Sequence, residues 1–137
     1  MGVREIADQI KPEVAILGRG VGGEPYFDPT AYAPATGARF GTSGFNQLRG
    51  PGSVNLDMSL FRTFQATESF KIQIRAEALN LTNTPHFANP ASNVSNASFN
   101  PDGTVKALNG FGLITQTAPL GRTIDQRYFR FGLRLTF

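Results

Sequence analysis

Apolar and polar residues alternate with a period of two in three windows of the chain, a pattern typical of β-strands with two different faces. The windows are residues 53–64, 70–81 and 125–137. In the last window one face is apolar throughout, and its members are Phe129, Phe131, Leu133, Leu135 and Phe137. Water does not stabilise such a face, so we predict that apolar material covers it.

The same division into faces holds in the other two windows, apart from Phe61 and Arg62. Their apolar members are Val54, Leu56, Met58, Leu60 and Phe64, followed by Phe70, Ile72, Ile74, Ala76 and Ala78. We predict that the opposite face is polar and in contact with water. Its members across the three windows are Asn55, Asp57, Ser59, Lys71, Gln73, Arg75, Glu77, Arg130 and Arg134. The pattern predicts an all-β, antiparallel fold.

The spacing of the windows also predicts how the strands pair. Residues 65–69 have hairpin length, so the first two windows form a hairpin. Matching faces favour Phe64 opposite Phe70, Leu60 opposite Ile74 and Met58 opposite Ala76.

The third window is expected to lie antiparallel beside residues 70–81. The expected pairs are Phe137 with Phe70, Ala76 with Phe131, Ala78 with Phe129, Arg75 with Gly132 and Glu77 with Arg130.

Proline bounds the irregular regions, because it cannot donate to a strand ladder. All nine prolines lie before residue 53 or within residues 82–124. We therefore predict a loop region over residues 1–52 and a long loop over 82–124, with a short strand at 111–115. Residues 53–137 are then the strand-bearing region.

Composition and motifs argue against several classes of function. The chain has no cysteine, and its net charge of +3 includes no basic run, so we expect no nucleic-acid partner. Gly18, Gly20 and Gly23 have dinucleotide-motif spacing, but prolines follow where the motif requires a helix. We expect no cofactor and no enzymatic activity. A small hydrolase that uses His86, the one histidine, stays a remote alternative.

A sheet with one apolar and one charged face fits two kinds of protein. One is a soluble all-β ligand- or glycan-binding module, whose charged face is solvated and whose long polar loops bind the ligand. The other is a transmembrane barrel, in which lipid covers the apolar face and the polar face lines the lumen.

Three blocks of sequence resemble the C-terminal end of TonB-dependent outer-membrane receptors, closest to the Oar-like, carboxypeptidase-regulatory-like group. They are RGPGSVNLDMSLFRTF (49–64), FKIQIRAEALNLTNTPHFANP (70–90) and RYFRFGLRLTF (127–137). The resemblance extends over residues 11–137. It implies an antiparallel, three-strand end piece of a large transmembrane β-barrel with long irregular loops, located in the outer membrane.

The resemblance further implies roles for the residues. Phe129, Phe131, Leu133, Leu135 and Phe137 match the terminal signal that the barrel-assembly machinery reads. Residues 1–52 and 82–124 are expected outside the cell, and residues 65–69 in the periplasm. The partners implied are outer-membrane lipid, the assembly machinery, and the rest of the receptor barrel and its plug. No signal peptide or plug is recognisable, so we expect a receptor fragment that is not competent for transport alone, with an unknown ligand.

Overall fold

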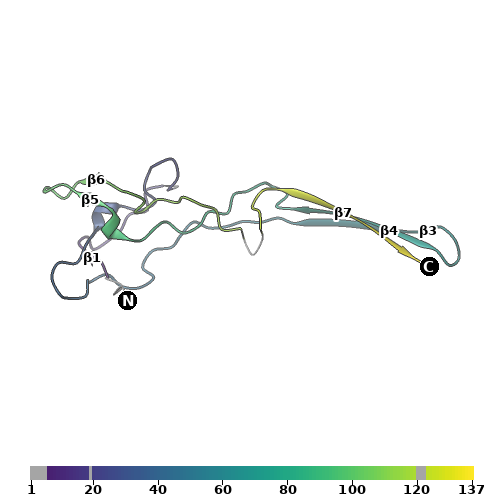
Figure 1. Ribbon diagram of the computed structural model, residues 1–137, viewed down its shortest axis with the longest axis horizontal. Helices are drawn as coiled ribbons and strands as arrows, with labels where there is room; N and C mark the ends of the chain where they lie inside the picture. Colours follow the sequence, from purple (N-terminus) through teal and green to yellow (C-terminus); the bar gives the residue numbers. More distant parts are fainter. Residues whose placement is uncertain (1–5, 19, 120–122) are drawn as a thin grey trace. The chain divides into compact units, whose positions relative to one another are not determined.

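The computed structural model describes residues 6–18, 20–119 and 123–137. The elements in these ranges are short or long β-strands and two single-turn 3₁₀ helices (Figure 1). In chain order they are β1 (Asp8–Gln9), η1 (Pro29–Ala31), β2 (Tyr32–Ala33), β3 (Met58–Gln65), β4 (Lys71–Leu79), η2 (Val94–Asn96), β5 (Ser98–Phe99), β6 (Val105–Ala107) and β7 (Tyr128–Thr136). Every strand pair is antiparallel, as predicted for an all-β chain.

The chain divides into two compact units. The loop unit consists of the described part of residues 1–51 together with residues 87–116. The sheet unit consists of residues 52–86 and the described part of residues 117–137. The predicted loop 82–124 therefore contributes to both units.

The sheet unit is built on one three-stranded sheet with the order β3-β4-β7 (Figure 1). The predicted register of β4 and β7 is confirmed: Ala76 pairs with Phe131, Glu77 with Arg130 and Arg75 with Gly132. Small residues thus lie opposite phenylalanines on one face. On the other face, opposite charges meet.

The predicted register of the β3–β4 hairpin is wrong by two residues. Leu60 pairs with Ala76 instead of Ile74, and Phe64 pairs with Ile72 instead of Phe70. The cause is the turn, in which the Phe70 carbonyl accepts hydrogen bonds from the amides of Ala66 and Thr67 at 2.9 and 3.2 Å. Phe70 therefore belongs to the turn. The shift is an even number, so the predicted matching of faces is kept.

The strands are also shorter than the windows of alternation. β3 begins at Met58 because the residues before it bond to the loop after β4 instead of to a neighbouring strand. The Leu56 carbonyl accepts from the Leu81 amide at 2.8 Å. β4 ends at Leu79 because Asn80 takes a positive φ of 48°.

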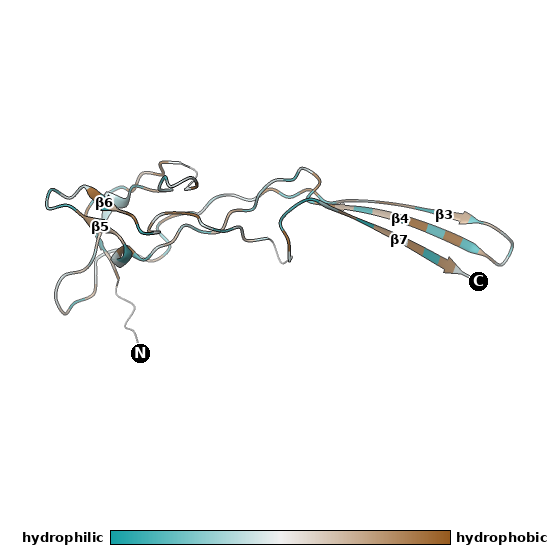
Figure 2. Ribbon diagram, turned by 45° about the horizontal axis from the view of Figure 1, so that its top comes forward, coloured by the Kyte–Doolittle hydropathy of each residue, from teal (hydrophilic) through white to brown (hydrophobic). Residues whose placement is uncertain are grey.

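Hydrophobic and hydrophilic residues alternate along the strands of the sheet (Figure 2), so its two faces differ as the alternation predicts. The apolar face is exposed, and its large exposed members are Met58, Leu60, Phe64, Ile74, Phe129, Phe131, Leu133 and Leu135. Phe131 is 78% exposed, and Phe137, just past β7, is 96% exposed. Among the described residues of the sheet unit, this apolar face is therefore broad and exposed.

The loop unit has a small core of its own. Phe27 makes edge-to-face contacts with Tyr32 and Phe111 at centroid distances of 5.9 and 5.4 Å. Ala31 and Val94 complete the buried cluster. Residues that look irregular along the sequence thus pack around aromatic rings.

Two details of the loop unit correct or explain the sequence analysis. The predicted strand at 111–115 is wrong, because this segment forms turns in which the Leu113 amide bonds the Gly110 carbonyl at 3.0 Å. Gly20 has a φ of 70°, and a Cβ there would lie 2.9 Å from the Ile114 side chain. Gly20 therefore permits a close approach between two segments of the loop unit.

Candidate functional site

A buried polar cluster lies at the end of β4, in the segment NLTNTPH (80–86). Asn80 is 1% exposed and His86 is 2% exposed. The Asn80 side-chain amide donates to the carbonyls of Thr84 and Asp125 at 2.9 and 2.6 Å. Its Oδ1 accepts from the Thr84 amide at 3.0 Å, and its own backbone amide donates to Asp57 Oδ1 at 2.9 Å. Asn80 thus connects the segments before β3, after β4 and before β7.

His86 completes the same cluster. Its Nδ1 lies in hydrogen-bond contact with Asp125 Oδ1, and its backbone amide donates to Asp125 Oδ2 at 2.8 Å. Its Nε2 lies 3.1 Å from the Val54 carbonyl. Both ring nitrogens are therefore engaged by the protein. These contacts join the segment after β4 to the segments before β3 and before β7. Because both ring nitrogens already have protein partners, neither is available to activate a nucleophile.

The His86–Asp125 pair was missed in the sequence, where the acids nearest to His86 are Glu77 and Asp102. Asp125 is 39 residues away along the chain. The sequence signal for this cluster was the segment NLTNTPH (80–86) with its two asparagines. Asparagine tolerates positive φ and bonds to nearby backbone, so such a segment favours a tight, hydrogen-bonded turn. Asn80 and Asn83 both have positive φ, of 48° and 52°.

The predicted polar residues of β4 and β7 lie together on one face of the sheet. Glu77 Oε2 lies 3.5 Å from Arg130, and Glu77 Oε1 lies 3.7 Å from Arg75. Lys71 pairs across the strands with Thr136, and Gln73 pairs with Arg134. The charge on this face is therefore mainly positive, with one carboxylate bridging two arginines.

Two other predicted polar residues lie elsewhere. Asn55 and Asp57 precede Met58, the first residue of β3. Asp57 accepts a hydrogen bond from the Asn80 backbone amide and so belongs to the buried polar cluster. Ser59 lies in β3 opposite Glu77. Four of the predicted assembly-signal residues lie in β7 on the apolar face, and they are Phe129, Phe131, Leu133 and Leu135.

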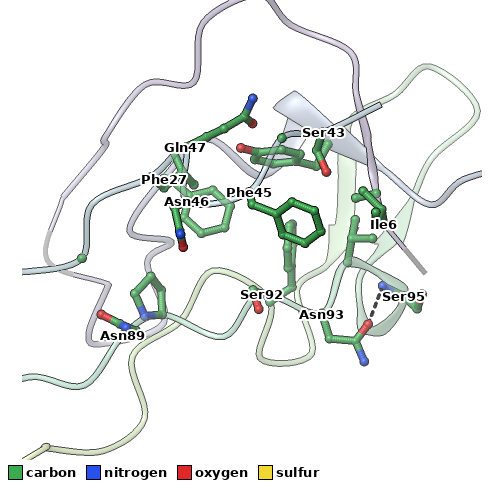
Figure 3. A pocket seen from close by; sticks show the side chains of 18 of the residues that line it. Ile6, Phe27, Ser43, Phe45, Asn46, Gln47, Asn89, Ser92, Asn93 and Ser95 are labelled. Atoms are coloured by element: carbon green, nitrogen blue, oxygen red, sulfur yellow. Dashed lines mark hydrogen bonds between the residues drawn. The ribbon is translucent and has the colours of Figure 1, made fainter. Parts of the chain in front are cut away.

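The loop unit contains a groove of about 960 Å³ (Figure 3). It lies between residues 43–50 and 89–95, with Phe27, Tyr32 and Phe111 at its base. Phe45 lies among the labelled polar side chains and is 85% exposed. The surrounding polar groups are neutral amides and hydroxyls, apart from Arg49: Ser43, Asn46, Gln47, Asn89, Ser92, Asn93 and Ser95. An exposed ring among neutral hydrogen-bonding groups suits an uncharged, polar ligand.

Two further findings concern the described ranges 6–18, 20–119 and 123–137. No group of three or more His, Asp or Glu side chains is placed there to hold a metal ion. No helix in these ranges is long and apolar enough to cross a membrane.

The comparisons with known proteins give one result. No curated protein and no solved structure matches the chain. The family model described as outer membrane beta barrel domain matches residues 4–125, which include the loop-unit segments, β3 and β4. This match agrees with an antiparallel sheet that has one exposed apolar face and one charged face. The chain belongs to the outer membrane beta barrel domain family.

Proposed function

We propose that this chain is the C-terminal segment of a TonB-dependent outer-membrane receptor. It supplies barrel wall, extracellular loops and an assembly signal. The observation that carries the proposal is the sheet β3-β4-β7, whose exposed face is apolar from Phe129 to Leu135 while its other face carries arginine and lysine. Lipid covers the first face, and the lumen lies on the second.

The chain works as part of a larger barrel. A three-stranded sheet has two open edges, here β3 and β7, and open edges are not tolerated in the hydrocarbon region. Large outer-membrane transporters close with about 22 strands around a plugged lumen. The partners are therefore the remaining barrel strands and the plug, the surrounding lipid, and the assembly machinery. The role is structural and ligand-contacting, without catalysis and without transport by this segment alone.

The connections give the orientation. β3 and β4 are joined by a short turn, whereas β4 and β7 are joined by residues 80–127, which contribute to the loop unit. Short turns of such barrels are periplasmic and long loops are extracellular. The loop unit, with the groove around Phe45, is therefore on the ligand side. The ligand is uncharged and polar if the groove contacts it.

A chimera tests the receptor proposal. Residues 53–137 replace the corresponding last three strands of a complete TonB-dependent receptor whose ligand is known. We expect the chimera to reach the outer membrane, to show heat-modifiable mobility, and to take up the ligand only when TonB is present.

The matched control chimera carries Ile74→Glu and Phe131→Glu on the apolar face, and we expect it to fail to assemble, because charge facing lipid is destabilising. Normal assembly of this control contradicts the lipid-facing assignment. Assembly of the unmodified chimera without TonB-dependent uptake contradicts the receptor role while leaving the barrel role intact.

The groove favours one second candidate, a soluble all-β module that binds an uncharged ligand such as a glycan. Detergent dependence separates the two candidates. A soluble module purifies as a monomer without detergent, whereas the barrel segment requires detergent or lipid, because its apolar face is too large to remain in water.

A further inference from the structure

The groove of the loop unit contains an exposed phenylalanine that takes no part in the core beneath it. Phe45 is 85% exposed, whereas Phe27, Tyr32 and Phe111 at the base of the groove are buried. Burying an aromatic ring is one of the largest favourable contributions that a single side chain makes. An exposed ring inside a concave site therefore offers a surface on which a ligand can pack, and Phe45 presents such a ring (Figure 3).

The turn that carries Phe45 has a defined backbone conformation. Asn46 has a positive φ of 55°, which asparagine tolerates better than most residues. A Cβ at Gly44 would lie 2.8 Å from Gln47 Nε2, so glycine leaves room for the Gln47 side chain to fold back over the turn. The turn therefore presents one ring and two side-chain amides from a single short segment.

The opposite wall of the groove, residues 89–95, contacts the first wall at Gly50. A Cβ at Gly50 would collide with Asn89 Oδ1, so glycine is required for the Asn89 side chain to lie there. The Ala91 carbonyl accepts from the Gly112 amide at 2.8 Å, which anchors this wall to the segment after β6. The walls are thus joined before a ligand binds, which lowers the entropic cost of binding.

The side-chain amides and hydroxyls of the groove are free to bind a ligand. Within the described part of the chain, the side chains of Asn46, Gln47, Asn89 and Ser92 make no hydrogen bond to another residue. An amide side chain offers both donors and an acceptor, and a serine hydroxyl donates and accepts as well. The described lining residues include no carboxylate, and Arg49 among them is exposed.

A ligand that matches this groove has an apolar face for the ring and an edge of groups that both donate and accept hydrogen bonds. An apolar ligand would leave the amides and hydroxyls without partners. A cation would find no carboxylate among the described lining residues, and an anion would find an exposed guanidinium whose attraction water screens. A pyranose sugar meets both requirements, because its C–H groups lie on its flat faces and its hydroxyls lie on its edge.

We propose that the groove of the loop unit binds a neutral carbohydrate. Phe45 packs against the flat face of a pyranose ring, and the amides of Asn46, Gln47 and Asn89 bond to its hydroxyls. The groove volume of about 960 Å³ is within the range of about 300–1,000 Å³ that is usual for drug-sized ligands, so an oligosaccharide fits. This inference rests on the proposed function, because it names the class of ligand that meets the extracellular loops.

Titration of the purified full chain with sugars tests the inference. The chain is kept in a detergent whose headgroup contains no sugar, and calorimetry measures the binding of neutral oligosaccharides of glucose, galactose, mannose and N-acetylglucosamine. We expect at least one of them to bind, and we expect Phe45→Ala to weaken its binding about tenfold because the variant lacks the ring on which the sugar packs. Phe45→Tyr keeps a ring and is expected to retain most of the affinity. Binding of none of these sugars contradicts the carbohydrate site.

The matched control is Phe40→Ala. Phe40 is 72% exposed and belongs to the same unit, but it does not line the groove, so we expect the affinity to be unchanged. Equal losses in Phe40→Ala and Phe45→Ala contradict packing of the sugar on Phe45. Asn89→Ala tests the opposite wall and is expected to weaken binding about fivefold, the usual effect of one neutral hydrogen bond.

Two other ligands are tested in the same way. A neutral tetrapeptide of glycine, asparagine and serine that binds where no sugar does, with the binding lost in Phe45→Ala, overturns the carbohydrate assignment. A glucuronic acid oligosaccharide that binds more tightly than every neutral sugar, with the gain lost in Arg49→Gln, overturns the assignment of a neutral ligand.

The outcomes also separate this inference from the function on which it rests. A chain that binds no sugar, while the receptor chimera assembles and takes up its ligand, contradicts the carbohydrate site alone. Sugar binding by the full chain together with a chimera that fails to assemble contradicts the barrel role and supports the carbohydrate site.

Discussion

Asn80 combines a left-handed backbone with a fully used side chain. Its φ is 48°, and its side chain bonds to Thr84 and to the Asp125 carbonyl. Asn80→Gly keeps the backbone conformation and loses the side-chain bonds, which we expect to cost about 1–3 kcal/mol. Asn80→Ala adds backbone strain of about 1 kcal/mol. Urea unfolding in detergent micelles measures both.

The control for these variants is Asn93→Ala, because the Asn93 side chain is exposed and bonds only to its near neighbours Ser95 and Asn96 within the described residues. We expect a change below about 1 kcal/mol there. Equal stability of the alanine and glycine variants at position 80 contradicts the strain argument.

Asp28 gives the loop unit an expected dependence on pH. Burial raises the pKa of its carboxyl, but hydrogen bonds from Lys11 and Thr30 outweigh this effect and hold the pKa below the ordinary value of 3.8. Since the pKa is lower in the folded state, the stabilisation is complete above the unfolded value and is lost as the pH falls through the folded value. The Thr30 amide donates to Asp28 at 2.9 Å. We expect the protection of this amide against hydrogen exchange, measured relative to an unfolded chain at the same pH, to fall below about pH 4.

Asp28→Asn provides the comparison for this pH dependence. It keeps an acceptor for the Thr30 amide and removes the titrating group. We therefore expect the protection of the Thr30 amide to depend much less on pH in this variant. A protection of Thr30 that is the same at neutral pH and in strong acid contradicts the role of the carboxylate.

Among the elements, β4 and β7 are aligned by apolar packing and by one charged pair. Glu77 Oε2 lies 3.5 Å from Arg130 Nη1. The Glu77 side chain is 23% exposed and the Arg130 side chain is 62% exposed, so solvent screens their attraction. A double-mutant cycle with Glu77→Gln and Arg130→Gln is expected to give a coupling free energy of about 0.2–1 kcal/mol. The control cycle pairs Glu77→Gln with Arg134→Gln and is expected to give about zero. Equal couplings mean that the pair does not help to set the register.

The corrected register of β3 and β4 is testable because the chain has no cysteine. Leu60 lies directly opposite Ala76, whereas Ile74 is diagonal to it. Opposite Cβ atoms are about 4.5–5.5 Å apart and diagonal ones about 7–8 Å apart. We therefore expect a Leu60→Cys, Ala76→Cys double variant to oxidise faster in detergent than Leu60→Cys, Ile74→Cys. The reverse order supports the register predicted from the sequence.

For the whole molecule, the apolar row that includes Phe137 is expected to control membrane assembly. In the receptor chimera, Phe137→Asp is expected to reduce the folded outer-membrane fraction, because an aromatic residue at the interface anchors the strand and a charged one does not. Phe137→Tyr serves as the control and is expected to assemble. Unchanged heat-modifiable barrel after Phe137→Asp contradicts the assembly-signal role.

Local alternation was enough to predict the three strands of the sheet, their faces and the β4–β7 register. It was not enough for the hairpin, where the turn residues decided the pairing, nor for residues 53–57, which alternate like a strand. Those residues bond instead to the segment after β4, as Asp57 does with Asn80. Alternation predicts which face of a strand a residue is on. It does not predict which segment of the chain forms backbone hydrogen bonds with that residue.

The sequence by itself determined that this protein has a sheet with an apolar and a charged face, because a period of two is a local property of the chain. Only the tertiary structure decided what the remaining residues do. It joined His86 to Asp125 and packed Phe27 against Phe111, and it placed Phe45 in a groove. These contacts join residues far apart in sequence, and their partners are fixed by the packing of non-periodic segments, which no repeating pattern encodes.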